Sequence, residues 1–453
     1  MAKQPKLFPL TQSQVLMLYN MSFSFRKQNV NIVSVINFLG DVDPKLLLQA
    51  TTLSMLRNEA ASLRICKEGK QIMQYFSDAP MDPVEFYDFS DRTMAEVEQQ
   101  YRAWGKIPFA KTSRNVQLHR EKLVLKPDGK YSLFFCVNHI VFDAYSLMTN
   151  VRDIITIFIA LRDGTPLPKP MPSPLPAYQA DWDYEQSEQK KKDLEFWYDT
   201  FKTEPVYTSV NKLGGKGFVK GKRYGVTTRL IANTADFHNR VVPKALNDRV
   251  QAKAQEFRVS PQCLYLLAAR TFFSRESGRE QDVTIINTVA RRATMAQKRA
   301  GGTLVHSVMF RSILEGSLSF KAACEKMQQY QSMYYRHADL SFPEMADAFI
   351  KTHKVPPLRG YQACVFTYQP YFVAFTETVP ISFARIPNGV SATPLYLSIM
   401  PGDDSGDMQC NYEYNVGSIT PQRLDEFHDF MLRLLDLGTQ SPDLTLDQLM
   451  DRC

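Results

Sequence analysis

The sequence predicts a mixed α/β protein built from two lobes, on three observations. Apolar strand-like runs such as NIVSVINFLG (31–40) alternate along the chain with segments of helical periodicity. Six prolines alternate between residues 166 and 176, which excludes a helix interior or a central strand and favours an extended connector. Hydrophobic residues make up 44% of the 453 residues, enough for a large core. We therefore expect an N-terminal lobe over residues 1–170 and a C-terminal lobe over residues 171–453.

Each expected element of the first lobe has a local cause. Thr11 is a favourable N-cap for a helix near the start of the chain, and Asp43–Pro44 supplies a cap and a first-turn proline for a second helix. The run from Leu133 to Val137 is apolar throughout, which is typical of a central strand. The other expected elements are a strand at 31–40, a hairpin that turns at Glu68–Gly69, a polar helix at 93–104, two strands joined by a turn at 127–129, and a helix from about Tyr145 to Leu161.

The second lobe is expected to begin with one charged helix over about Tyr178–Phe201. The basic, glycine-rich segment 212–223 lacks the spacing of a phosphate-binding loop, so we interpret it as an exposed turn. The elements expected after it are helices near 243–257, 261–275, 318–337 and 420–438, and strands at 282–290 and near 362–369, 393–400 and 408–415.

Composition and charge exclude several classes of protein. The net charge of +7 is small for this length and does not indicate a nucleic-acid-binding protein. No apolar run approaches the ~20 residues that span a bilayer, and the N-terminus lacks the features of a signal peptide. The seven cysteines are scattered and form no CxxC pair, so we expect reduced thiols in a cytoplasmic protein with no membrane association and no metal site.

One stretch, NHIVFDAYS (138–146), carries candidate chemistry. His139 follows an apolar strand, and Asp143 comes four residues later, after a turn and before a helix. A strand end projects a side chain while the rigid sheet fixes its position. A neutral imidazole suits proton transfer near pH 7, and the carboxylate needs either that imidazole or an arginine as its partner. The pattern suits acyl transfer, but a histidine at a strand end also serves as an ordinary hydrogen-bonded core residue, so spacing alone leaves both roles open.

Segment 138–146 resembles the HHxxxDGxS signature of the condensation domains of nonribosomal peptide synthetases, which belong to the chloramphenicol-acetyltransferase-like acyltransferases. Other blocks resemble blocks of the family and fall in the family's order, so the resemblance covers nearly the whole chain. These blocks are FPLTQSQVLMLY (8–19), RNEAASLR (57–64), YQADW (178–182), LEFWYDTF (194–201), TVARR (288–292), GTLVHSVMFR (302–311), HADLSFPE (337–344) and VFTYQ (365–369).

The resemblance implies two acetyltransferase-like lobes arranged as a V-shaped pseudo-dimer with a central tunnel. It implies an enzyme that joins a carrier-bound acyl or aminoacyl thioester to an amine, with His139 orienting or deprotonating the amine. No permanently bound cofactor is implied, because the substrates arrive on the phosphopantetheine of carrier proteins, or on CoA. The length suits one such domain, either freestanding or a part of a larger synthetase. The Met1 start favours a freestanding monomer, which we expect to meet its carrier proteins in trans, with a small-molecule or carrier-bound amine as acceptor.

The chain departs from the family pattern at three positions. Asn138 replaces the first histidine of the motif, and Ala144 replaces its glycine, where the added methyl either narrows the tunnel or changes the tolerated backbone angle. Tyr396 stands where the family has an acidic residue, and it is expected to line the tunnel together with Ser398. Tyr145 and Ser146 suit either the tunnel wall or the start of the helix.

The resemblance implies that Asp143 is structural and pairs with an arginine, which agrees with the high cost of an unpaired buried carboxylate. Arg292 is the predicted partner, and Arg64 and Arg311 are its rivals. The basic segment 291–299 is a candidate surface for acidic carrier proteins, although a solvated loop explains it equally. Two other functions stay open: an O-acyltransferase that forms an ester, and a degenerate, non-catalytic recruitment domain, which Asn138 and Ala144 would suit.

Overall fold

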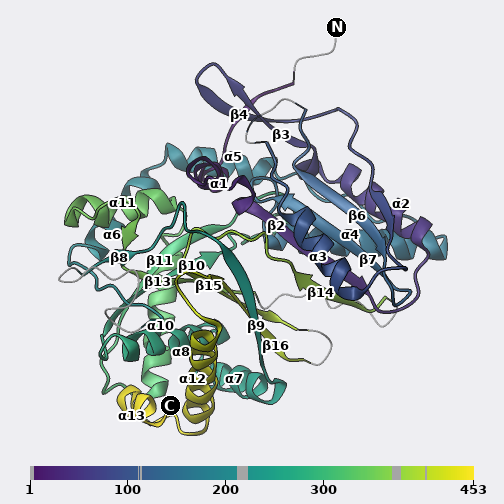
Figure 1. Cartoon of the computed structure of the whole chain (residues 1–453). Coiled ribbons are helices and arrows are strands. Elements are labelled where there is room, and N and C mark those ends of the chain that lie inside the picture. Colours follow the sequence, from purple (N-terminus) through teal and green to yellow (C-terminus); the bar gives the residue numbers. More distant parts are fainter. Residues whose placement is uncertain (1–4, 111, 113–114, 212–222, 370–378, 403–405) are drawn as a thin grey trace. The chain divides into compact units, whose positions relative to one another are not determined.

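A computed structural model describes residues 5–110, 112, 115–211, 223–369, 379–402 and 406–453 (Figure 1). Helices and several sheets alternate along the chain, which confirms the predicted mixed α/β class. The chain divides into two compact units that are not continuous in sequence. The first comprises Met1–Gln186, Ala290–Val305 and Phe372–Val390, and the second comprises Ser187–Val289, His306–Tyr371 and Ser391–Cys453. The lobe boundary at residues 170 and 171 and the V-shaped arrangement stay predictions.

The first unit is built on a five-stranded sheet in the order β14-β2-β7-β6-β5. Its central strand β7 is buried along nearly its whole length, as expected from the apolar run. The edge strand β14 comes from the later segment of the unit and pairs antiparallel with β2. The strands are β2 (Asn31–Phe38), β5 (Glu85–Asp88), β6 (His119–Leu125), β7 (Tyr131–Asn138) and β14 (Ile381–Arg385).

Helices and a hairpin complete the first unit. A three-stranded sheet in the order β1-β4-β3 contains the expected hairpin, which turns at Gly69 with a left-handed φ of 59°. The helices are α1 (Gln12–Phe23), α2 (Pro44–Arg57), α3 (Met94–Gly105), α4 (Ala144–Asp163), α5 (Leu175–Glu185) and α9 (Met295–Arg299), with short 3-10 turns η1 (Lys27–Val30) and η2 (Glu59–Ser62) and strands β1 (Phe8–Pro9), β3 (Leu63–Glu68) and β4 (Gln71–Phe76).

Helix α4 begins and ends for local chemical reasons. Asp143 is its N-cap and forms a reciprocal capping box with Ser146, and Gly164 ends it in the left-handed conformation. The helix packs against α2 and contributes its apolar face to the core of the unit. By length and composition α4 could cross a membrane, but most of that window is buried within the protein, as in a core helix.

The second unit is built on a six-stranded sheet in the order β11-β10-β13-β15-β16-β9. Strands β10, β13 and β15 run parallel to one another, and the other neighbours are antiparallel. The strands are β9 (Ala235–Val242), β10 (Asp282–Val289), β11 (His306–Ile313), β13 (Gln362–Tyr368), β15 (Leu395–Pro401) and β16 (Met408–Asn415), and a separate two-stranded sheet pairs β8 (Gly225–Val226) with β12 (Arg359–Gly360).

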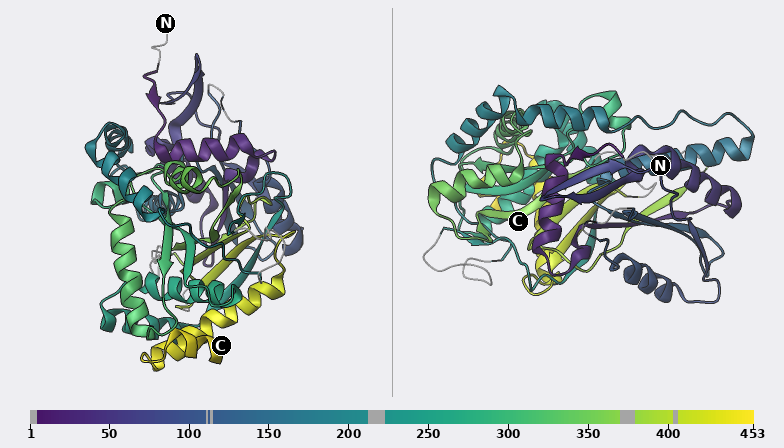
Figure 2. Two further views of the ribbon diagram at one scale, coloured as in Figure 1. Left: turned by 90° about the vertical axis from the view of Figure 1, so that its left-hand side faces the viewer. Right: turned by 90° about the horizontal axis from the view of Figure 1, so that it is seen from above.

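Helices pack with the six-stranded sheet to form the core of the second unit. Helix α8 is buried from Cys263 to Ser274, and α12 packs against both α8 and α7 near the C-terminus, where Figure 2 shows it in yellow. None of the seven cysteines, all of which lie among the described residues, forms a disulfide. The helices are α6 (Glu188–Thr200), α7 (Lys244–Phe257), α8 (Pro261–Glu276), α10 (Phe320–Tyr335), α11 (Phe342–His353), α12 (Pro421–Gln440) and α13 (Leu446–Arg452).

Some expectations about individual elements were wrong. The single helix predicted over Tyr178–Phe201 is two helices, α5 and α6, because Ser187 interrupts the pattern and caps α6 with its hydroxyl.

The exposed turn predicted at 212–223 lies almost wholly outside the described residues. The sequence patterns also missed several elements that the structure contains. The missed elements are the strands β1, β5, β8, β9, β11, β12 and β14, the helices α9, α11 and α13, and the 3-10 turns η1 and η2.

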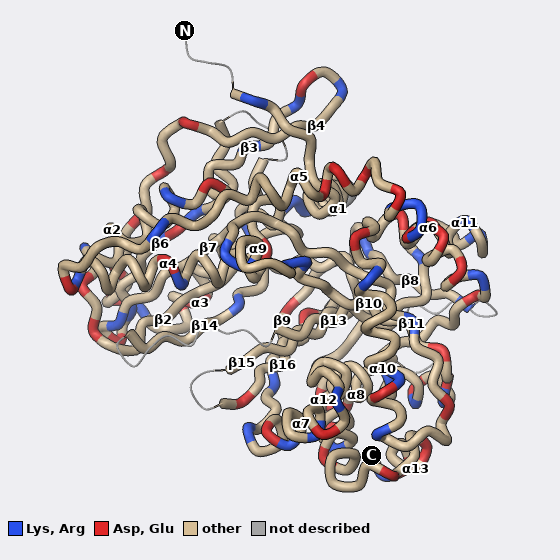
Figure 3. The backbone as a smooth tube through the Cα atoms, turned by 180° about the vertical axis from the view of Figure 1, so that it is seen from behind, with Lys and Arg blue, Asp and Glu red and all other residues tan. Residues whose placement is uncertain are grey.

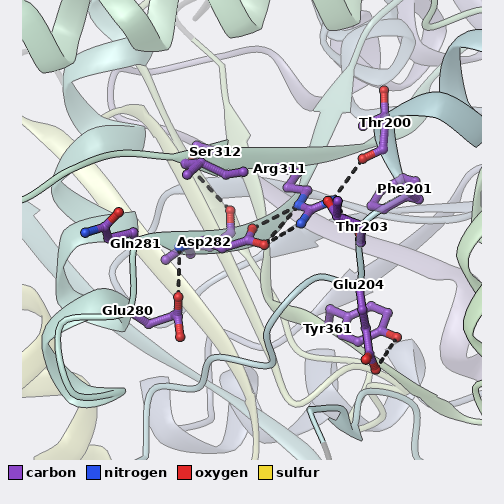
Figure 4. Close-up of polar contacts among 12 residues, drawn as sticks. Thr200, Phe201, Thr203, Glu204, Glu280, Gln281, Asp282, Arg311, Ser312 and Tyr361 are labelled. Atoms are coloured by element: carbon purple, nitrogen blue, oxygen red, sulfur yellow. Dashed lines mark hydrogen bonds and ion pairs between the residues drawn. The ribbon is translucent and has the colours of Figure 1, made fainter.

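A buried ion pair joins two strands of the second unit (Figure 4). Arg311 of β11 donates to both carboxylate oxygens of Asp282 at the start of β10, over N–O distances of 2.6–3.1 Å. Its remaining nitrogen donates to the carbonyl oxygens of Thr200 and Thr203 at 2.9 and 2.8 Å. The side chains of Arg311 and Asp282 are only 5% and 12% exposed, so each charge depends on the other for compensation.

We expect Arg311→Met to lower the free energy of unfolding by about 3–5 kcal/mol, because it leaves Asp282 buried without its cation. Urea denaturation measures the change. Lys244→Met is a matched control, since the Lys244–Asp248 pair is 57% exposed on both sides and its loss should cost at most about 1 kcal/mol. Equal effects of the two substitutions would contradict the assignment of Arg311 as a buried structural cation.

Candidate active site

His139 is held by its backbone from two sides. Strand β7 ends at Asn138, and a turn over residues 139–141 leads into α4. The His139 N–H donates to the carbonyl oxygen of Val30 at 2.8 Å, and its own carbonyl accepts from the Thr303 hydroxyl at 2.6 Å. The ring is partly exposed, while its Nδ1 is buried without a hydrogen bond among the described residues. This geometry presents an imidazole on a fixed backbone.

The surroundings of the His139 ring favour its uncharged form. Burial lowers the pKa of His139, and the positive charge of Arg385 at the end of β14 lowers it further. The Asp143 carboxylate acts in the opposite direction, but the net shift of the His139 pKa is downward. At neutral pH the ring is therefore a free base that can accept a proton.

Asn138 shapes the turn that carries His139. Its side-chain carbonyl accepts from the Ile140 N–H at 3.0 Å, and its backbone carbonyl accepts from the Val141 N–H at 3.0 Å. An Asn side chain that bonds the backbone two residues ahead mimics a backbone turn. Asn138 is almost fully buried, so its amide serves the local geometry of the loop.

Asp143 is tied to Arg292 and does not hydrogen-bond the His139 ring in any described contact. One Arg292 nitrogen donates to both Asp143 oxygens at 3.0 Å, and the Leu304 and Ser146 N–H groups donate at 3.0 and 2.7 Å. Burial by itself raises the pKa of this carboxyl, but the Arg292 charge and these hydrogen bonds outweigh burial, so the Asp143 pKa lies below its ordinary value. Asp143 is therefore an ionised structural anchor.

Arg292 also organises the segment 290–305, to which it belongs. Its guanidinium donates to the carbonyl oxygens of Gln297, Ala300 and Gly302 at 2.6–2.9 Å, so the segment folds around its own side chain. The Arg292 side chain is 1% exposed. Because Asp143 receives bonds from both Arg292 and Leu304, one carboxylate holds this segment against the start of α4.

Gly302 allows the same segment to approach α5 closely. Its φ is +93°, and a Cβ there would lie 2.5 Å from the Tyr178 hydroxyl. A larger residue at this position would meet both backbone strain and a clash. Arg291 anchors the segment as well, because it donates at 2.7 Å to Asp181 of α5, which accepts the Gln12 N–H through its other oxygen at 2.8 Å.

The structure places the two rival arginines elsewhere. Arg64 is buried and donates to the carbonyl oxygens of Ala61 and Leu63, both at 3.0 Å. Arg311 pairs with Asp282, as described above. Of the three candidates, only Arg292 forms an ion pair with Asp143.

The residues after Asp143 begin α4. Ala144 is its first residue and has no left-handed backbone angle, so the glycine of the family motif is not needed here for conformational freedom. Ser146 is buried and completes the capping box with Asp143, so of its two expected roles the contacts support the one at the start of the helix. The Arg292 guanidinium lies over the Tyr145 ring, with its central carbon Cζ 4.9 Å from the ring centroid.

Tyr396 and Ser398 belong to the second unit, where they lie on β15. The Tyr396 hydroxyl is 2.8 Å from the Thr367 hydroxyl of β13. Ser398 is aligned with Thr367 on one side and Asn411 of β16 on the other, which produces a buried row of small polar side chains across three strands. Their expected role in lining a tunnel stays a prediction.

Sequence reasoning missed two residues that contact or influence His139. Thr303 bonds the His139 carbonyl, and Arg385 supplies the nearby positive charge. Thr303 lies inside the block GTLVHSVMFR (302–311), which resembles a block of the family, but nothing in the local sequence pattern connects it with residue 139. Arg385 is the last residue of the short strand β14, whose pairing with β2 is a tertiary feature.

We expect Arg292→Met to lower the free energy of unfolding by about 3–5 kcal/mol at pH 7, because it leaves Asp143 buried and uncompensated. The native carboxylate contributes stability above the unfolded Asp pKa of about 3.9 and loses it as pH falls through its lowered folded pKa. In the variant the folded carboxyl takes up a proton more readily, so the difference from the native protein should shrink toward pH 4. Denaturation at several pH values tests this. Arg102→Met, which removes a partly exposed arginine paired with Glu98, is the control. A stability difference between Arg292→Met and the native protein that does not depend on pH would contradict the expectation.

A family model for the condensation domain matches residues 4–450. Among curated relatives, one of the subunits of plipastatin synthase from Bacillus subtilis is 21% identical over 422 residues, which are 92% of this chain and 16% of that protein. Surfactin synthase subunit 1 of Bacillus subtilis is 20% identical over 448 residues, 98% of this chain and 12% of that protein. The chain thus spans less than a fifth of the length of either relative.

Solved structures of condensation domains have the same fold as this chain. The first condensation domain of the calcium-dependent antibiotic synthetase, in complex with a substrate analogue, matches with a TM-score of 0.82 at 17% identity, over 98% of this chain and 99% of that one. VibH, a condensation enzyme of nonribosomal peptide synthesis, matches with a TM-score of 0.76 at 12% identity, over 96% and 99%. With a family model that covers almost every residue, this chain belongs to the condensation-domain family.

Proposed function

We propose that the protein is an acyltransferase that joins a carrier-bound acyl or aminoacyl thioester to an amine and forms an amide. The observation that carries this proposal is His139, an uncharged imidazole on a backbone pinned by Val30 and Thr303. Family membership and the relatives among peptide synthetases support the same reaction class.

In the proposed reaction, the amine nitrogen attacks the thioester carbonyl carbon. The C–N bond forms, the C–S bond breaks, and the proton lost by the amine ends on the departing thiol, so no external reductant or oxidant is needed. His139 would accept that proton from the amine and pass it on, or hold the amine in the reactive orientation. Holding two tethered reactants together contributes much of the rate. Asp143 and Arg292 would act by positioning the turn.

The substituted motif positions favour catalysis over a recruitment role. Asn138 forms two hydrogen bonds that define the turn, and Ala144 fits the first turn of α4 without backbone strain. The loop geometry around His139 is therefore intact despite both departures. The buried Asp143–Arg292 pair stabilises the fold in either role, so the feature that favours catalysis is the uncharged, partly exposed imidazole of His139.

The proposed partners are carrier proteins supplied in trans, with phosphopantetheine or CoA carrying the acyl group. The basic segment 291–299 is only partly available to them, because Arg291 and Arg292 are committed to Asp181 and Asp143. Its exposed part is α9, where Lys298 and Arg299 face solvent and basic residues are visible in the tube view (Figure 3). This short basic surface would suit an acidic partner.

We expect His139→Ala to reduce the rate of product formation from loaded carriers by about 10²–10⁴-fold, as for the loss of a general base. Intact-protein mass spectrometry of the carriers measures the rate. Thr156→Ala, an exposed change on α4, is the control and should keep the native rate. An unchanged rate in His139→Ala would remove the catalytic assignment.

The acceptor class is tested in the same assay. One acyl-carrier donor is offered a matched amine and alcohol in parallel. An amide product that depends on His139 supports the proposal, whereas an ester product alone would assign the protein to O-acyl transfer.

The rate should also depend on pH through His139. Because its pKa lies below the 6.5 typical of histidine, the ring is a free base near pH 7, and its contribution to kcat/KM should be lost as pH drops through that lowered value. Protonation of the amine acceptor adds a limb that the native protein and His139→Ala share, so the ratio of their kcat/KM values from pH 5 to 8 isolates the contribution of His139. The proposal fails if that ratio does not fall toward low pH.

A further inference from the structure

Helix α1 holds the residues on both sides of His139. The Gln14 side chain donates from Nε2 to the Ile140 carbonyl oxygen at 3.3 Å, across 126 residues of sequence. Closer to the C-terminal end of the helix, the Met21 sulfur accepts a hydrogen bond from the Asn138 side-chain amide at 3.6 Å. The turn that carries His139 is therefore tied to a single helix both before and after the histidine, and all of these residues belong to the first unit.

The Gln14 amide takes part in three hydrogen bonds. Its oxygen accepts from the Thr11 N–H at 2.8 Å and completes the capping box at the start of α1. Its nitrogen carries two hydrogens, of which one bonds Oε1 of Gln74 on β4 at 2.7 Å and the other bonds the Ile140 carbonyl. The Gln14 side chain is fully buried, so the loss of its N–H groups would leave buried oxygen atoms without these donors.

The neighbours of Gln14 allow only one orientation of its amide. The Pro9 carbonyl oxygen can only accept, so the Gln74 nitrogen faces it, at 2.7 Å, and the Gln74 oxygen faces Gln14. The Thr11 N–H can only donate, so the Gln14 oxygen faces it. Groups outside the turn thus fix both ends of the amide, and the second N–H is directed at Ile140.

The contact with Gln14 restrains a peptide plane next to His139. The peptide between Ile140 and Val141 donates its N–H to the Asn138 carbonyl at 3.0 Å. It accepts from Gln14 through its C=O, so the peptide is held at both ends. Without the Gln14 bond it would be held at one end only and would be freer to rotate. The position of the imidazole depends on the backbone of this turn, because the ring has no described hydrogen bond at Nδ1.

We propose that Gln14 is a positioning residue for His139 and acts through the Ile140 carbonyl. The effect on the reaction rate rests on the proposed function, because positioning changes the rate only if His139 takes part in the reaction. The geometric part of the inference, that Gln14 fixes the turn and thereby the ring, does not depend on which bond the protein forms.

Substitution of Gln14 in the full chain tests this role. Gln14→Met keeps the length of the side chain and removes both N–H donors. We expect kcat for product formation from loaded carriers to fall about 10–10²-fold with an unchanged KM, as for a displaced catalytic group. NMR of selectively labelled histidine gives a second measurement, because the signal of the His139 ring, identified by its absence in His139→Ala, should shift in Gln14→Met.

Two further variants separate positioning from helix capping. Gln448 has the same place in the capping box of α13 and accepts the Thr445 N–H at 3.0 Å, but its side chain is exposed. Gln448→Met therefore loses the same kind of cap and should keep the native kcat and the native His139 signal. Gln14→Glu keeps the cap, since Glu is a usual capping-box residue, but a carboxylate has no N–H for Ile140. It should lose kcat as Gln14→Met does.

Thermal unfolding verifies that each variant is folded, and Gln14→Glu decides the question if Gln14→Met does not fold. If His139→Ala is inactive, both the fall in kcat and the shift of the ring signal are required, and the absence of either in a folded Gln14 variant overturns the proposal. An equal loss of kcat in Gln448→Met also overturns it. If His139→Ala keeps the native rate, the proposed function fails, and the ring signal alone then decides: a shift supports the positioning of His139 by Gln14, and an unshifted signal overturns it.

Discussion

The buried pair of Asp143 and Arg292 is the interaction on which the candidate site depends. The carboxylate caps α4, accepts the Leu304 N–H and receives the guanidinium, so one side chain joins the helix start to the segment 290–305. Arg292 in turn gathers three carbonyl oxygens of that segment. Neither charge could remain in this buried position alone, because the desolvation cost of each is offset only by the other and by these hydrogen bonds.

The position of His139 is a consequence of that pair. The segment held by Asp143 includes Thr303, whose hydroxyl bonds the His139 carbonyl, and the opposite side of the turn is fixed by the Val30 carbonyl just before β2. The imidazole is therefore supported through its backbone, while its ring receives no described hydrogen bond at Nδ1. Burial and the Arg385 charge keep the ring uncharged. Rigid support combined with a free-base ring is the arrangement expected of a positioned base.

Local sequence patterns predicted much of the fold, because caps and periodicity act over a few residues. Thr11, Asp43 and Pro44 mark the helix starts that the structure shows, and the apolar run at Leu133–Val137 is the central strand β7. Prediction failed where a local signal was weak: a single Ser187 cap divides α5 from α6. The short strand β14 has its cause in pairing with a distant strand, which no window of sequence contains.

For the candidate site, too, local sequence patterns predicted one part and long-range packing decided the other. The sequence by itself determined the motif that carries His139 and Asp143, the helix that follows Asp143, and the need of the carboxylate for a partner, either the imidazole or an arginine. It left three arginines as candidates for that partner and gave no reason to consider Thr303 or Arg385. Only the tertiary structure decided that Arg292 pairs with Asp143, that Arg311 pairs with Asp282 and that Arg64 bonds carbonyl groups. The physical reason is that ion pairing depends on which segments the long-range packing brings within about 3 Å, and spacing along the chain does not contain that information.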